Sequence, residues 1–118
     1  PKSVEESAAL KDIHFDFDKS VITDVSKETL KTNAAWLKNN GAKKIQVEGH
    51  CDERGTNEYN LALGDRRASA AKNYLVLLGI DSKRVSTVSY GEEKPLCAQQ
   101  SEDCWAKNRR GHFVVVTK

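Results

Sequence analysis

Long apolar stretches, long runs of one charge and internal repeats are all absent from this sequence. No segment approaches the roughly 20 consecutive apolar residues that a membrane-spanning helix needs. The 19 basic and 17 acidic residues are interspersed and give a net charge of +2, so the charge pattern does not predict nucleic-acid binding. There is also no low-complexity tract and no signal-peptide pattern, and we expect the sequence to be the mature or trimmed soluble part of a protein.

The size and composition predict one domain. A chain of 118 residues with 38% hydrophobic content can build a single core that buries roughly two-thirds of its unfolded surface. Residues 1–11 have little hydrophobic periodicity, and we interpret them as the end of a linker. Residues 12–118 carry the regular patterns and form the predicted domain.

Four segments of the sequence have apolar patterns typical of β-strands. Residues 12–18 and 45–48 alternate between apolar and polar residues, and residues 85–90 form a third predicted strand. A fourth segment, residues 113–116, is continuously apolar, which suits a central strand covered on both faces. With two helices between the first three strands, the pattern predicts an α+β fold, in which two main helices pack on one mixed four-stranded sheet with a βαβαβ core.

The two helical patterns have recognisable ends. The first starts at Thr23 or Asp24 and ends at Asn40-Gly41, where a glycine suits a positive φ angle. The second is predicted to be capped by Asn57 and to end at Gly79.

The three cysteines have different surroundings. Cys97 and Cys104 lie in a polar loop at a spacing that can close a small disulfide in an oxidising compartment, with two free thiols as the alternative. The same loop has room for a short helix that begins at Ser101. Cys51 is in phase with the apolar residues of the second strand, and we expect it to be a small buried side chain.

The stretch from Gly49 to Ala68 places seven charged side chains between a strand pattern and a helical stripe. Arg67 falls in the middle of that stripe, and a buried guanidinium must find an anion. Asp52, at the end of the preceding strand, is the nearest candidate along the chain. The pair is either a salt bridge that anchors the helix or a socket for a ligand that carries both charges. If the two residues pair, Asp52→Ala would leave the buried Arg67 without an anionic partner. We therefore expect Asp52→Ala to destabilise the fold more than Arg67→Ala.

Metal sites and nucleophilic catalysis are poorly supported. Zinc binding by the successive residues His50, Cys51 and Asp52 would need them to converge, whereas successive strand side chains point to opposite faces. Residues 16–24 mimic the start of a calcium loop but lack its turn glycine and its bidentate glutamate. No Gly-x-Ser-x-Gly elbow is present. We therefore expect no metal and no cofactor.

A carboxylate pair offers the alternative of an enzyme. Asp18 and Asp52 could in principle supply the acid and base of a hydrolase. Arg67 beside them would keep both carboxylates ionised, which suits binding better than proton transfer. We expect the protein not to be an enzyme.

Four separated motifs carry a resemblance to a known family. In chain order they are Phe15-Asp16-Phe17-Asp18-Lys19, the run from Gly49 to Ala68, Ser89-Tyr90-Gly91-Glu92-Glu93-Lys94-Pro95 and Lys107-Asn108-Arg109-Arg110. From roughly residue 12 to residue 117, the sequence resembles the peptidoglycan-associated lipoprotein branch of the OmpA-like domain family. Four motifs in the right order make the resemblance specific.

The resemblance implies non-covalent binding of peptidoglycan through the diaminopimelate of its stem peptide. Arg67 would bind the ligand carboxylate and Asp52 its ammonium. Phe17 and Asp18 match further pocket residues of the family. The full set of expected ligand-binding residues is Phe17, Asp18, Asp52, Thr56, Asn60 and Arg67. Asn60 is expected to contribute its amide, and exposed N–H groups near Thr56 favour an anionic group.

The resemblance also implies a cellular setting. The domain would face the periplasm and be held to the outer membrane by a lipidated N-terminus that lies outside this sequence. It would tether the membrane to the cell wall and contact a TolB-like β-propeller protein within the Tol-Pal system. The alternatives are a peptidoglycan hydrolase that uses Asp18 and Asp52, and a module that binds only a protein partner.

Overall fold

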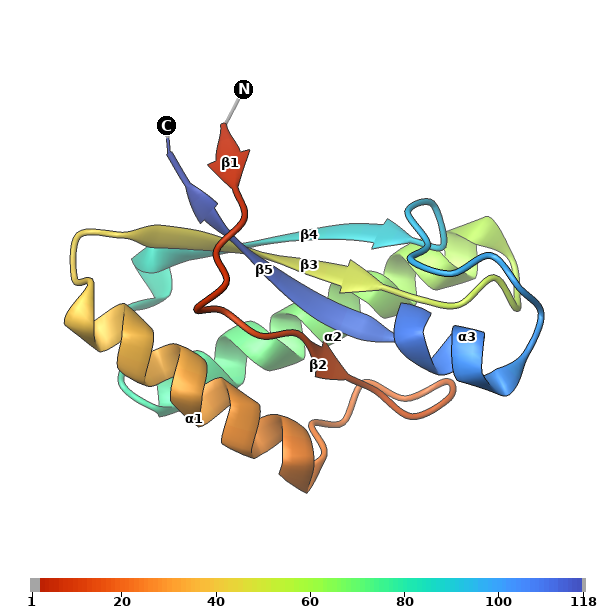
Figure 1. Cartoon of the computed structure of the whole chain (residues 1–118), viewed down its shortest axis with the longest axis horizontal. Helices are drawn as coiled ribbons and strands as arrows, with labels where there is room; N and C mark the ends of the chain where they lie inside the picture. The colour runs from red at the N-terminus through yellow and green to blue at the C-terminus, as the bar shows by residue number, and fades with distance from the viewer. Residues whose placement is uncertain (1–2, 118) are drawn as a thin grey trace.

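A five-stranded mixed sheet forms the centre of the computed structural model, which describes residues 3–117 (Figure 1). The strand order is β1-β5-β3-β4, and β2 also pairs with β5. In chain order the elements are β1 (Val4–Glu5), β2 (Ile13–His14), α1 (Asp24–Asn39), β3 (Lys44–His50), α2 (Asn57–Leu77), a 3₁₀ turn (Ser82–Arg84), β4 (Val85–Gly91), α3 (Glu102–Asn108) and β5 (Arg110–Val116). The mixed sheet and the two main helices are as predicted, and the short strand β1 is additional.

The sheet combines one parallel pair with antiparallel pairs. β3 and β4 are parallel, and α2 provides the crossover that such a connection needs. β5 is antiparallel to β3, with Ile45 opposite Val115 and Val47 opposite Phe113. β5 therefore occupies the interior position that its apolar run predicts, and Phe113 and Val114 on its two faces are both buried.

The hydrophobic core lies between the sheet and the two long helices. It includes Leu30, Ala34 and Leu37 of α1, Ile45 and Val47 of β3, Ala68, Ala71 and Leu75 of α2, and Phe113 and Val115 of β5. The odd-numbered residues of β3 and β5 thus share one face, as the alternation predicts. None of the helices within residues 3–117 has the length and apolar character to cross a membrane.

Each helix begins at a hydroxyl side chain. Thr23 caps α1, and Ser101 caps α3 at the predicted position. Thr56 caps α2, whereas Asn57, the predicted cap, is the first residue inside the helix. The Thr56 hydroxyl accepts from the backbone N–H of Tyr59, which satisfies one of the free donors at the helix start.

The two long helices end differently. Gly79 follows α2 with a φ of +104°, and the N–H of Ile80 bonds back to the carbonyl of Leu75, the pattern of a glycine stop. The positive φ expected at Gly41 is not found. Asn40 caps α1 instead, with its backbone and side-chain N–H groups bonded to carbonyls of the last turn.

The predicted strand 12–18 is much shorter than expected. β2 ends at His14 because its partner there, Arg110, is the first residue of β5. A turn follows, in which Asp18 has a φ of +58°, a conformation that Asp tolerates better than most residues. Phe17 in this turn is 54% exposed, so its alternation with Phe15 does not reflect a strand.

The segment interpreted as a linker contacts the domain. β1 pairs with the end of β5, with Val4 opposite Val116, and Leu10 is buried in the core. The division into a linker at residues 1–11 and a domain at residues 12–118 stays a prediction.

A close contact between β3 and α2 positions the loop that joins them. A Cβ atom added to Gly49 would lie 1.7 Å from the carbonyl oxygen of Gly64, so only glycine allows this approach. The start of α2 is thereby held against the end of β3, and residues 51–56 between them form one wall of a pocket.

Candidate functional site

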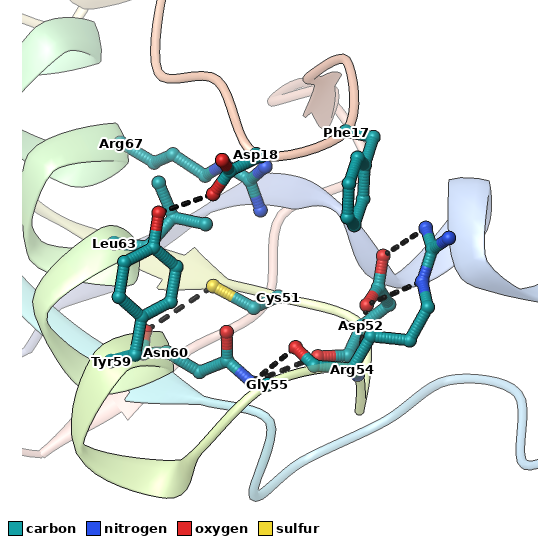
Figure 2. Close-up of a pocket in the computed structure, with 10 residues that line it drawn as sticks. All are labelled: Phe17, Asp18, Cys51, Asp52, Arg54, Gly55, Tyr59, Asn60, Leu63 and Arg67. Carbon is teal, nitrogen blue, oxygen red and sulfur yellow. Dashed lines mark hydrogen bonds and ion pairs between the residues drawn. The ribbon is translucent and has the colours of Figure 1, made fainter.

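A pocket of about 230 Å³ opens where the end of β3, the start of α2 and the turn after β2 meet (Figure 2). It is lined by Phe17, Asp18, Cys51, Asp52, Arg54, Gly55, Tyr59, Asn60, Leu63 and Arg67. The structure therefore brings together five of the six residues predicted to bind a ligand. The sixth, Thr56, caps α2 and is not among the lining residues.

Asp52 shares its carboxylate with two arginines. Arg54 donates from Nε to Oδ1 at 3.2 Å and from Nη2 to Oδ2 at 2.9 Å, and this fork is visible in Figure 2. Arg109 Nη1 lies 3.5 Å from Oδ2. Burial alone would raise the pKa of Asp52, but the hydrogen bonds from Arg54 and the two positive charges outweigh it and hold the pKa below its ordinary value. Asp52 is therefore an ionised group at neutral pH.

The Arg54 guanidinium lies between two aromatic rings. Its Cζ is 4.0 Å from the ring centroid of Phe17 and 3.9 Å from that of Trp105 in α3. Both distances are within the range of cation–π contacts. The fork on Asp52 is thus held in a fixed plane by groups from three separate parts of the chain.

Arg67 is 1% exposed, and backbone oxygens surround its guanidinium. Nε donates to the carbonyl of Lys19 at 2.8 Å, Nη1 to that of His50 at 3.0 Å and Nη2 to that of Asp16 at 3.1 Å. Burial lowers the pKa of Arg67 from its ordinary value. Arg67 therefore ties the first turn of the pocket to the end of β3.

The predicted salt bridge between Arg67 and Asp52 is wrong. Within residues 3–117, the cationic groups at ion-pair distance from Asp52 are Arg54 and Arg109. The partial charges of three carbonyl oxygens satisfy the Arg67 guanidinium in place of a carboxylate. The two residues share a pocket without pairing, which leaves space between them for a ligand.

The turn after β2 supplies the outer wall. The Tyr59 hydroxyl donates to Asp18 Oδ1 and links this turn to α2. Asp18 is exposed, unlike Asp52, so its second oxygen and its remaining lone pairs stay available. Phe17 presents a hydrophobic surface beside it.

Asn60 has a largely structural role in this conformation. Its buried Nδ2 donates to the carbonyls of Asp52 and Arg54, at 3.3 and 3.0 Å, and to Glu92 Oε1 at 2.9 Å. These bonds shape the loop that carries Asp52. The predicted ligand contact through this amide would therefore depend on its oxygen.

Cys51 is buried at the floor of the site, as predicted. Its thiol donates to the carbonyl of Asn60 at 3.2 Å. Burial raises the pKa of Cys51 to about 11, because the neighbouring Arg67 only partly offsets the loss of hydration. The thiol is neutral at physiological pH and is a poor nucleophile.

The remaining chemistry of the site favours binding over catalysis. A carboxyl group that acts as a general acid near neutral pH needs a raised pKa, whereas the pKa of Asp52 is lowered. Metal-binding clusters of three or more His, Cys, Asp or Glu side chains are absent from residues 3–117.

Sequence reasoning missed several residues of the site. Arg54, Tyr59 and Leu63 line the pocket, and Trp105 packs on Arg54 from 51 positions later in the chain. The only local signal was the position of Arg54, two residues after Asp52 in the charged run. No pattern in the sequence links Trp105 to that run.

Comparison with protein families and curated proteins gives consistent matches. The OmpA family model matches residues 14–109. The peptidoglycan-associated lipoprotein of Brucella melitensis is 46% identical over 103 residues, which cover 87% of this chain and 61% of that protein. The protein of the same name from Haemophilus influenzae is 50% identical over 98 residues, covering 83% of this chain and 64% of that protein. The chain thus spans less than two-thirds of the length of these relatives.

Solved structures agree with the predicted fold class. The crystal structure of the peptidoglycan-associated lipoprotein from Burkholderia pseudomallei has a TM-score of 0.85 and 41% identity, and the match covers 88% of each chain. The C-terminal domain of Helicobacter pylori MotB has a TM-score of 0.84 and covers 92% of this chain and 85% of its own. At 20% identity, that second match shows a shared fold alone.

Proposed function

The chain belongs to the OmpA family, and on that premise we propose that its pocket binds the diaminopimelate end of a peptidoglycan stem peptide without catalysing a reaction. The observation that carries the proposal is the charge of the pocket. Two carboxylates and two guanidiniums line one small cavity: Asp18, Asp52, Arg54 and Arg67. The side chain of diaminopimelate ends in an ammonium and a carboxylate on the same carbon, so it carries both charges in close proximity.

Arg67 retains donors for the ligand carboxylate. A guanidinium has five N–H groups, and three of those of Arg67 are used on backbone carbonyls. One N–H remains on each Nη, and a pair of this kind can bind a carboxylate in a bidentate manner. The three carbonyl contacts hold the guanidinium in place before the ligand arrives.

The ligand ammonium has two acceptors. Asp52 is ionised and faces the pocket, although Arg54 already occupies both of its oxygens. Asp18 has free acceptor capacity, and it lines the same cavity. We place the ammonium between these two carboxylates.

A pair of stem peptides tests the proposal. Lysine lacks the side-chain carboxylate, so the lysine form loses a charge-assisted hydrogen bond worth about 1.5–3 kcal/mol, or roughly ten- to a hundredfold in affinity. Titration calorimetry with the diaminopimelate and lysine peptides measures this difference, and equal affinities would contradict the proposal.

A matched pair of variants locates the site. Arg67→Lys keeps the charge but removes the fork, and we expect it to weaken binding of the diaminopimelate peptide. Arg84 provides the control because it also donates to three backbone carbonyls, those of Leu37, Asn40 and Lys43, and lies outside the pocket. Arg84→Lys should leave the affinity unchanged.

At the level of the whole protein, we propose that this domain tethers the outer membrane to the cell wall. The relatives named peptidoglycan-associated lipoprotein support this role. The domain would lie at the periplasmic face of the outer membrane, with lipid attachment through a part of the protein outside this sequence. A TolB-like β-propeller protein of the Tol-Pal system is the proposed protein partner.

Incubation with purified sacculi separates this function from its alternatives. Cosedimentation without release of soluble fragments supports a tether. Released fragments would indicate a hydrolase built on Asp18 and Asp52, and the absence of cosedimentation would indicate a module that binds only protein.

A further inference from the structure

Trp105 contacts two successive residues of the loop that carries Asp52. Its ring lies 3.9 Å from Arg54 Cζ, and its indole Nε1 donates to Glu53 Oε2. Trp105 itself does not line the pocket. Of the two loop residues that Trp105 contacts, Arg54 is the one that lines the pocket, so Arg54 is the direct link from Trp105 to a ligand.

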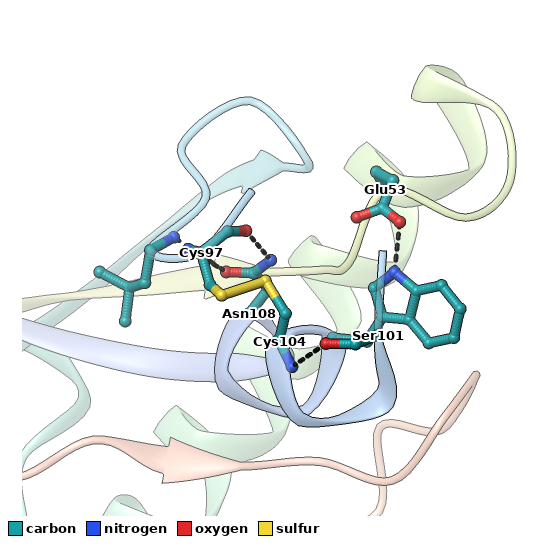
Figure 3. Close-up of a disulfide and its surroundings, with 7 residues drawn as sticks. Glu53, Cys97, Ser101, Cys104 and Asn108 are labelled. Atoms are coloured by element: carbon teal, nitrogen blue, oxygen red, sulfur yellow. Dashed lines mark hydrogen bonds between the residues drawn. A yellow bond between two sulfur atoms is a disulfide. The ribbon is translucent and has the colours of Figure 1, made fainter. Parts of the chain in front are cut away.

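The helix that carries Trp105 is fastened at several points. Cys104, the residue before it, forms a disulfide with Cys97 in the preceding loop, as predicted from the sequence (Figure 3). Asn108, at the end of α3, donates to the carbonyl of Cys97 at 2.8 Å and accepts from the N–H groups of Leu96 and Cys97. These bonds join the loop and α3 into one unit.

The next residue ties this unit to the pocket turn. Arg109 Nε donates to the carbonyl of Phe15 at 2.9 Å, and Arg109 Nη2 bonds to Glu102 Oε2 at 2.9 Å. Phe17, the second ring on Arg54, follows two residues after Phe15. Arg109, the C-cap residue of α3, therefore links the helix that carries Trp105 to the segment that carries Phe17.

We infer that Trp105 is a positioning residue of the binding site: together with Phe17 it clamps Arg54 so that the guanidinium fork stays on Asp52, and the Cys97–Cys104 disulfide holds the helix that supplies it. The inference rests on the proposed function, because it assigns to that site a determinant outside the pocket. A purely structural Trp105 would support α3 without affecting Arg54 or Asp52.

The clamp has a defined effect on the ligand. Arg54 is 32% exposed in its side chain, so it can swing into solvent if one ring is lost. Asp52 then loses its closest partner, and the cation that shares the pocket with the ligand is no longer fixed. Both changes alter the arrangement of charges around the ammonium and carboxylate of the bound diaminopimelate.

Two substitutions distinguish the contribution of the aromatic ring of Trp105 from that of its volume. Trp105→Phe keeps a ring over Arg54 but lacks the indole donor, and Trp105→Leu keeps apolar volume without a ring. Trp36 in α1, which is partly buried against the core, gives the control Trp36→Leu. The double variant Cys97→Ser with Cys104→Ser removes the anchor of α3.

The first readout needs no ligand. Nuclear magnetic resonance follows the Arg54 Nε–H signal, which two flanking rings shift, and the titration of the Asp52 carboxyl group. We expect Trp105→Leu to move the Arg54 signal and to raise the titration midpoint of Asp52. In Trp105→Phe both quantities should stay close to their wild-type values, and in Trp36→Leu they should be unchanged. In the double serine variant both should shift in the same direction as in Trp105→Leu.

The second readout is affinity for the diaminopimelate stem peptide. We expect Trp105→Leu to weaken binding about tenfold, in line with the loss of one cation–π contact that fixes a charged group, and Trp105→Phe to weaken it less. Folded Trp105→Leu with an unchanged Asp52 titration midpoint would overturn the inference, because the Arg54 signal also responds to the loss of the ring itself. If the Asp52 midpoint moves but the wild-type chain does not bind the peptide, the proposed function fails while the positioning role stands.

Discussion

Arg67 donates to the carbonyl oxygen of His50 at 3.0 Å and forms no ion pair with Asp52, although both side chains line one pocket. The buried cation is thus stabilised by the backbone, and the buried anion by two other arginines. This separation changes what each substitution should do to the fold.

We expect Arg67→Ala to destabilise the protein more than Asp52→Ala, which reverses the order expected from the sequence. Removing Arg67 leaves three carbonyl oxygens without a charged donor and opens a cavity, at a cost of about 3 kcal/mol. After Asp52→Ala, the Arg54 side chain can rotate into solvent, and Arg109 keeps its ion pair with Glu102. The free energy of unfolding should therefore fall by about 1–2 kcal/mol. Urea unfolding measures both values, and a larger loss for Asp52→Ala would contradict the assignment.

The elements that sequence patterns predicted well are those built from local contacts. The alternation in β3, the hydroxyl cap at Thr23 and the glycine stop at Gly79 each depend on residues within a few positions. The segment 12–18 failed because its length as a strand depends on where β5 begins, nearly a hundred residues later.

The sequence predicted which residues lie in the site better than it predicted which groups those residues bond to. Charge and chain position selected Asp52 and Arg67, but Arg67 is bonded to backbone carbonyls, and Asp52 is paired with Arg54 and with Arg109, which follows α3. Carbonyl oxygens have no sequence signature, because every residue has one. The clamp of Phe17 and Trp105 on Arg54 is likewise a product of tertiary packing.

The contact between β3 and α2 predicts a strong effect of a single methyl group. In Gly49→Ala the new Cβ would lie 1.7 Å from Gly64 O, and relieving this contact requires the helix to move, at a cost of about 3 kcal/mol or more. Gly41→Ala is the control, because nothing lies within 4 Å of its added Cβ. Thermal unfolding should separate the two variants clearly, and similar melting temperatures would show that the helix approaches less closely.

Thiol chemistry should distinguish the three cysteines. Alkylation without reductant should label none of the thiols readily, because Cys97 and Cys104 are bridged and Cys51 is buried with a pKa of about 11. Reduction should release two thiols, of which the partly buried Cys97 is more accessible than the buried Cys104, and remove at most about 2–3 kcal/mol of stability, as expected for so short a loop. Mass spectrometry counts the labels, and labelling of all three cysteines before reduction would exclude the bridge.

His112 on β5 connects the N-terminal segment to the sheet. Its Nδ1 lies 2.6 Å from Asp12 Oδ1 and its Nε2 lies 2.7 Å from Glu6 Oε1. The hydrogen bond to Asp12 is the largest cause that raises the pKa of His112 to about 9; burial partly opposes it, and the bond to Glu6 adds to it. His112 therefore remains protonated in the folded protein at a pH where an unfolded histidine, with a pKa of 6.5, is already neutral.

This difference predicts stability that is lost in alkaline solution. Between pH 6.5 and about 9 the folded state binds a proton that the unfolded state has released, so the free energy of unfolding falls as the pH rises. The stabilisation is fully present below pH 6.5, and its loss should reach roughly 2–3 kcal/mol above pH 9, since partial exposure reduces the value implied by the pKa shift. Urea unfolding at pH 6 and pH 9.5 measures the effect. His112→Gln should remove most of the slope, whereas His14→Gln, at an exposed histidine of β2, should retain it; an unchanged slope in His112→Gln would show that another group is responsible.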